Sequence, residues 1–214
     1  MLLSLFLSCA SDKPVEREPV FLQEGAPVAG VAEGLIDAPV GTPLGGYSSR
    51  CDYMGGSGSV DKRQSQYTES WNPSAGIQTS PKAKALWLEN GQEHFVLLVI
   101  DAIYVFDEMV EDLEQRLEDS TGHNLDGRVV ITASHSHNAP ANYSDQIHFY
   151  LGGDRYNEEI FQRYTTSLEH IALDAYQSRA PSSIGVSVAK DWDPEDNVYR
   201  DRREENNNLI LWDD

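Results

Sequence analysis

The sequence is poor in positive charge, in cysteine and in long apolar runs, and each shortage argues against a class of protein. Lys and Arg number 16 against 35 Asp and Glu, which gives a formal net charge of −19. A chain this acidic lacks the basic footprint of a nucleic-acid binder, so we expect no nucleic-acid partner. The acidity indicates a solvated surface and says nothing about the fold. The 2 cysteines are too few for a disulfide framework.

The start of the chain, Met1–Ala10, is an apolar run too short to span a bilayer. Because Cys9 follows Phe6-Leu7-Ser8, the run resembles the end of a bacterial lipoprotein signal, in which the cysteine becomes lipidated. The remnant of a plain signal peptide is the alternative. We therefore expect an exported protein, either anchored to the cell envelope through lipidated Cys9 or periplasmic or secreted.

The composition divides the chain into three segments. We expect residues 1–9 to be the signal remnant, and residues 10–26, which are charged, contain proline and lack hydrophobic periodicity, to be a tether. Residues 27–214 form the folded domain and are long enough for a sizeable core. Within it, residues 31–47 mix Gly and Pro with apolar residues, which predicts a strand followed by a tight loop.

A predicted hairpin lies near the middle of the chain. Residues 83–89 and 94–101 read as its strands, with Asn90-Gly91 as a two-residue turn. An acidic amphipathic helix over 107–118 follows, and the apolar run 129–132 predicts another buried strand. Strand, helix and strand in this order predict a crossover between neighbouring parallel strands, and so an α/β fold with a mixed sheet.

Three further elements are expected after this strand. Residues 143–156 are polar and aromatic and are expected to form a loop. Residues 157–177 repeat apolar residues at helical spacing behind Asn157, which predicts a helix with an asparagine N-cap. Residues 183–189 alternate as a strand does.

Two histidines, His135 and His137, follow the strand predicted at 129–132. Residues i and i+2 of an extended chain point to the same face, so the two rings are expected to face one space. Neutral imidazole is a good zinc ligand, and the short loop that ends at Pro140 leaves room for a substrate. On the pattern alone, solvated turn histidines are an equally consistent interpretation.

Asp101 is a second candidate, because it ends the apolar run of the hairpin. A carboxylate at the C-terminal end of a buried strand is a site candidate in an open α/β sheet. A helix-capping or loop-bracing aspartate is the alternative. His94 begins the same strand at the hairpin end, so we do not expect it to be a ligand.

The segment Ser134–Pro140, SHSHNAP, resembles the Thr-His-Thr-His-Ser-Gly-Pro signature of the neutral/alkaline (non-lysosomal) ceramidases. The resemblance extends to the first strand and loop of the domain, where that family has an Asp, a Gly/Pro turn and a Gly-Tyr pair. The matching residues are Asp37, Pro39, Gly41, Gly46 and Tyr47. The motif departs from the family where Asn138 replaces a serine and where Ala139 and Ala141 replace glycines.

The resemblance implies the N-terminal part of a larger ceramidase-like catalytic domain that hydrolyses N-acylsphingosine to a fatty acid and a sphingoid base. His135 would ligate Zn²⁺, and His137 would orient or shuttle a proton. Arg202 is the best match to an arginine that holds the polar head of the substrate, with Arg200 and Arg203 as competitors. The family's remaining zinc ligands, a second His, a Glu and a Tyr, come further along the chain.

The resemblance also implies substrate contacts from Asn138, Tyr47 and Asp101, so the expected partner is a lipid or another N-acyl amide. Two other functions are consistent with the sequence. One is a surface lipoprotein that binds a ligand without catalysis. The other is a metal-dependent esterase or amidase that acts on a different substrate of the cell envelope.

Overall fold

The computed structural model describes residues 27–47, 50–51 and 63–185. The predictions for Cys9 and Arg202 therefore lie outside the described residues. The chain forms a five-stranded sheet in the order β4-β3-β2-β1-β5. The strands are β1 Val28–Leu35, β2 Lys82–Asn90, β3 Glu93–Ile100, β4 Val129–Ala133 and β5 Ala180–Pro181.

The hairpin between β2 and β3 forms as predicted, but its turn lies one residue later. Asn90 still pairs with Glu93, so Gly91 and Gln92 make the turn. Gly91 has φ 64°, which suits the first central position of a tight hairpin turn. The Asn-Gly pair signalled a hairpin correctly, whereas the register of the two strands decided which residues turn.

The predicted crossover is confirmed, and with it the mixed α/β sheet. Helix α1, Asp107–Thr121, connects β3 to β4, and these two strands are parallel, whereas the other pairs are antiparallel. The helix ends at Gly122, whose φ of 72° is left-handed and whose N–H donates to the Glu118 carbonyl at 2.8 Å. A glycine there is a common helix stop, because the left-handed conformation costs it little.

The region after β4 differs in part from the prediction. Helix α3, Glu158–Gln177, has the expected Asn157 cap, whose side chain accepts from the Ile160 N–H at 3.2 Å. Residues 147–153, expected in a loop, form the short helix α2, Ile147–Gly153, because Phe149 packs against aromatic neighbours. Residues 183–185 are not in a strand, and the rest of the strand predicted at 183–189 lies outside the described residues.

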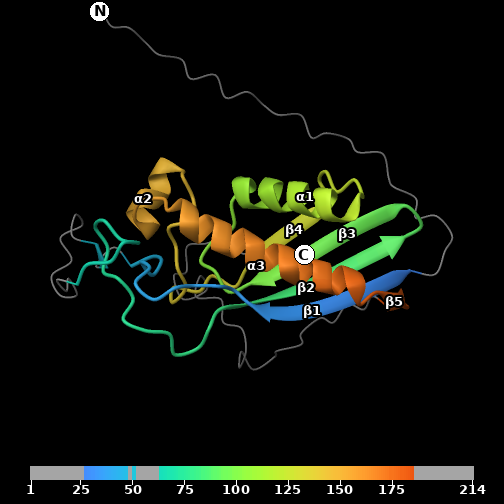
Figure 1. The fold of residues 1–214 in the computed structure, drawn as a ribbon, viewed down its shortest axis with the longest axis horizontal. Helices are drawn as coiled ribbons and strands as arrows, with labels where there is room; N and C mark the ends of the chain where they lie inside the picture. The colour runs from blue at the N-terminus through green and yellow to red at the C-terminus, as the bar shows by residue number, and fades with distance from the viewer. Residues whose placement is uncertain (1–26, 48–49, 52–62, 186–214) are drawn as a thin grey trace, which may run out of the picture. The chain divides into compact units, whose positions relative to one another are not determined.

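Helices α1 and α3 lie side by side on one face of the sheet, with α1 over β4 and α3 across β1 and β2 (Figure 1). Alternate strand residues point to the helices and are buried, as Trp87 and Leu98 are. Their neighbours on the other face, such as Val99 and Val130, remain exposed. Period-two alternation thus gives the sheet one helix-covered face. The helices contribute Met109, Leu113, Leu117, Ile160, Leu168 and Ile171 to the core.

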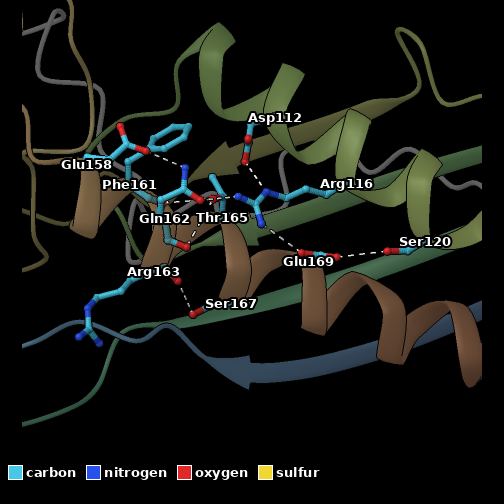
Figure 2. A network of polar contacts seen from close by, with 10 residues as sticks. All are labelled: Asp112, Arg116, Ser120, Glu158, Phe161, Gln162, Arg163, Thr165, Ser167 and Glu169. Carbon is cyan, nitrogen blue, oxygen red and sulfur yellow. Dashed lines mark hydrogen bonds and ion pairs between the residues drawn. The ribbon is translucent and has the colours of Figure 1, made fainter.

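A polar network joins the two helices on their outer side (Figure 2). The Arg116 guanidinium donates to Asp112 at 2.6 Å within α1 and to Glu169 at 3.3 Å on α3. It also donates to the side-chain oxygen of Gln162. One half-buried arginine therefore fixes the spacing of α1 and α3 through its planar fork of donors.

Asp154 ties the irregular segment 69–71 to the end of α2. Its side chain is buried and accepts backbone N–H bonds from Glu69 at 2.8 Å, from Ser70 at 3.2 Å and from Trp71 at 3.2 Å. It has φ 72° and ψ −175°, a conformation that L-residues rarely adopt. These hydrogen bonds hold the segment although it has no regular secondary structure.

Within the described ranges, no helix is both long and apolar enough to cross a membrane.

Candidate active site

The histidine loop leaves β4 at the carboxyl end of the parallel strand pair. Its backbone stays tied to the end of β3, because Ser134 N–H donates to the Ile100 carbonyl and Ser136 N–H to the Ala102 carbonyl, both at 2.9 Å. Between these two bonds, His135 adopts the left-handed φ of 57°. Strand alternation was expected to direct both rings to one face. That reason is wrong, because His135 is left-handed and not extended, and this kink directs the rings.

The imidazole of His135 is held from the β3–α1 connection. Its Nδ1 lies 2.9 Å from the Ile103 carbonyl oxygen, and its ring packs edge-on against Tyr104 at 5.4 Å between centroids. Because a carbonyl only accepts, Nδ1 carries the proton, and in the neutral ring Nε2 keeps its lone pair. This is the arrangement by which metal-ligating histidines are usually fixed.

His137 is fixed in the same way from the loop after β1. Its Nδ1 lies 3.1 Å from the Gly45 carbonyl oxygen, and its ring stacks on Tyr47 at 4.4 Å. Gly46 has φ 68°, and a Cβ there would lie 2.1 Å from His137 Nδ1. The Gly-Tyr pair of the ceramidase-like loop therefore lies against His137, and only glycine fits at position 46.

The two histidine rings meet edge to face, with their centroids 4.9 Å apart and their planes at 89°. His135 is exposed and His137 is half-buried, so solvent reaches the pair. Two imidazoles with fixed tautomers suit zinc chemically, but a zinc site has three or four protein ligands. Across the ranges that the structure describes, no group of three or more His, Cys, Asp or Glu side chains is placed to hold a metal ion.

Arg50 connects the two loops of the site. Its Nη1 donates to the His137 carbonyl at 2.7 Å and to the Gly45 carbonyl at 3.3 Å, and its guanidinium lies 5.0 Å from the centre of the Tyr47 ring. No sequence pattern pointed to Arg50, because it lies in a Gly/Ser-rich stretch without periodicity. Its role depends on the hydrogen bond to His137, a residue far along the chain that no local pattern relates to it.

Asp101 lies at the same edge, in the loop-bracing position. Its carboxylate accepts from Ser134 Oγ at 3.2 Å and from the Lys82 N–H at 3.1 Å. It therefore connects the start of β2 to the ends of β3 and β4. Its contact with substrate stays a prediction. Asn138 is exposed, and its backbone N–H donates to Ser136 Oγ at 3.3 Å.

The structure places His94 at the opposite end of β3, apart from this site. It is buried, accepts from Trp87 Nε1 at 3.3 Å and stacks on His123 at 3.8 Å. Burial and then the neighbouring His123 lower the pKa of His94 below its ordinary value of 6.5. His94 therefore belongs to the core, where burial disfavours its protonated form.

A surface pocket of about 550 Å³ is lined by residues 66–69 and 155–159. Neither histidine of the motif is among its lining residues. Its walls carry Glu69, Glu158 and Glu159 and no metal-ligating histidine, so the chemistry of the candidate site lies elsewhere.

The fold is similar to that of solved ceramidases, as the sequence motif predicts. Neutral ceramidase from Pseudomonas aeruginosa is 18% identical over 74% of this chain, with a TM-score of 0.59. A ceramidase complexed with C2 is 18% identical over 73% of this chain, with a TM-score of 0.56. This chain spans 23% and 22% of those chains, less than a quarter of their length. No protein-family model and no curated protein matches the chain.

Proposed function

We propose that this chain carries the histidine half of the site of a zinc-dependent hydrolase that cleaves the amide bond of an N-acyl lipid. The observation that carries the proposal is the meeting of His135 and His137, each with Nδ1 turned to a backbone carbonyl. The two histidines lie in the ceramidase-like motif, on a fold similar to that of solved ceramidases. Motif, fold and side-chain geometry thus support the same chemistry.

His135 would hold the metal through Nε2, since Nδ1 is bonded to the Ile103 carbonyl. When bound, zinc supplies a Lewis acid that polarises the amide carbonyl and makes water nucleophilic at neutral pH. The resemblance assigns the remaining ligands to a His, a Glu and a Tyr, and no described cluster provides them.

His137 would move the proton that amide hydrolysis requires. Its Nδ1 is engaged by Gly45, so Nε2 would accept a proton from water and return it to the leaving nitrogen. The stacked Tyr47 limits rotation of the ring and, being 60% exposed, presents a flat apolar surface to a substrate. We assign Arg202 to the polar head of the substrate and Cys9 to the lipid anchor of an exported protein.

The experiment is release of fatty acid by the purified full-length gene product, because the resemblance places the remaining zinc ligands further along the chain. Three substrates are compared: an N-acylsphingosine, an N-acyl amino acid and a fatty-acid ester. The variants are His135→Ala and His137→Ala, with His170→Ala as the matched control, because His170 is exposed on α3. We expect release from the N-acylsphingosine that both motif variants lose and the control keeps. Release from the ester alone would replace the amidase with an esterase. No release with zinc present would favour the non-catalytic binding protein.

A further inference from the structure

The loop that fixes His135 is itself held by a buried hydroxyl. The Tyr143 hydroxyl donates to the Tyr104 carbonyl at 2.9 Å and accepts from the Tyr104 N–H at 3.3 Å. Tyr143 is 1% exposed, and burial raises the pKa of its phenol well above the ordinary value, so the hydroxyl keeps its proton. One side chain thus satisfies both backbone groups of Tyr104.

Tyr104 contacts His135, and Ile103 bonds to it. The carbonyl oxygen of Ile103 accepts from His135 Nδ1 at 2.9 Å, and the Tyr104 ring packs on the edge of the same imidazole. Segment 101–106 connects β3 to α1 and has no regular structure over most of its length. Without the Tyr143 bonds, the backbone groups of Tyr104 would have to find other partners, and the neighbouring carbonyl would be free to turn.

We propose that Tyr143 is a positioning residue for His135, acting through Tyr104 and Ile103 to fix the ring and its Nε2 lone pair. As a role in metal binding, this rests on the function proposed above. As a role in fixing the tautomer of His135, it stands on the contacts alone. Partners that orient a ligating histidine commonly change metal affinity by about 10–100-fold.

Tyr164, which stacks on Tyr143, provides a matched control. Tyr164 is fully buried and stacks on Tyr143 at 4.9 Å. Its hydroxyl has no hydrogen-bond partner among the residues that the structure describes. Tyr164→Phe therefore removes a buried hydroxyl from the same place in the core without removing a contact to Tyr104.

The experiment compares Tyr143→Phe, Tyr164→Phe and the wild-type chain by ¹⁵N NMR of the histidine rings, first without metal. We expect His135 in the wild type and in Tyr164→Phe to show one tautomer with the proton on Nδ1. Tyr143→Phe should show a mixture of tautomers. A zinc titration of the same variants in the full-length gene product should then give a dissociation constant about tenfold weaker for Tyr143→Phe only.

A core truncation away from the site, Ile171→Val, separates positioning from general loss of stability. Ile171 lies under β1, so this variant should lower the unfolding midpoint and leave the His135 tautomer unchanged. If Tyr143→Phe keeps the wild-type tautomer and zinc affinity, the positioning role is wrong, and the zinc site stands. If the full-length wild type binds no zinc, the proposed function is wrong, and the tautomer alone decides the role of Tyr143.

A measurement on the wild type decides the matter if Tyr143→Phe does not fold. The Tyr104 amide should exchange slowly with solvent, and the Tyr143 hydroxyl proton should be visible by NMR, because the two groups are hydrogen-bonded. Rapid exchange of the Tyr104 amide overturns the proposal.

Discussion

Gly46→Ala tests whether the loop after β1 shapes the candidate site. A Cβ at position 46 would lie 2.1 Å from His137 Nδ1 and 2.3 Å from Cε1, closer than non-bonded atoms approach. The side chain of His137 must therefore move. Moving it breaks the hydrogen bond to Gly45 and the stack on Tyr47.

The expected cost has three parts. The left-handed φ of 68° costs an L-residue about 1–2 kcal/mol. The lost hydrogen bond contributes about 0.5–1.5 kcal/mol, and the lost aromatic pair about 0.5–1.5 kcal/mol. Together they lower the free energy of unfolding by about 2–5 kcal/mol.

Gly122→Ala is the matched control, because Gly122 has φ 72° and nothing lies within 4 Å of the Cβ it would gain. Gly122→Ala should lower the free energy of unfolding only through its left-handed backbone, by about 1–2 kcal/mol. The loss of unfolded-state freedom is the same in both variants and cancels. Urea unfolding should place Gly46→Ala below Gly122→Ala, and only Gly46→Ala should slow amide hydrolysis by the full-length protein, since His137 moves the proton. Equal midpoints and unchanged hydrolysis would refute the proposed packing of His137 on this loop.

Three further predictions concern the frame of the site. Because the pKa of His94 is lowered in the folded chain, only the unfolded chain binds a proton just below pH 6.5, so stability should fall as the pH drops below that value. His94→Gln should flatten this slope in urea unfolding, and an unchanged slope would contradict it. Arg116→Lys should cost about 1–3 kcal/mol in the same assay, since an ammonium cannot reproduce the forked contacts, and a neutral effect would show that the α1–α3 network contributes little. Asp154→Ala leaves buried N–H groups of residues 69–71 without their acceptor and should cost about 3 kcal/mol or more, with faster amide exchange there, whereas unchanged exchange would contradict the role of Asp154.

Much of the fold follows from local sequence patterns. The apolar strands, the Asn157 cap and the Gly122 stop each depend on residues close together in the chain, so they could be predicted. The short helix α2 could not, because the aromatic packing of Phe149 stabilises it. The turn at Gly91 moved by one residue because the register between strands, a non-local property, selects it.

Sequence patterns pointed to some residues of the candidate site and not to its geometry. His135 and His137 were evident from the motif, but the left-handed turn at His135 and the carbonyl partners of both rings come from segments distant in the chain. Arg50 and Tyr143 had no sequence signal, since an arginine in an irregular stretch and an aromatic after a loop are common. Asp101 was predicted to be either a site residue or a loop-bracing aspartate, and its hydrogen bonds to Ser134 and Lys82 brace the loops.

The most direct test of the account is the zinc content of the purified full-length gene product, which includes the segment expected to supply the remaining ligands, after equilibration with zinc and removal of the excess. It is measured beside His135→Ala and the exposed control His170→Ala. The account predicts about one zinc per full-length protein in the wild type and in the control, and none in His135→Ala. A wild type without zinc, or a His135→Ala variant that keeps it, would contradict the claim that the histidine loop is a metal site.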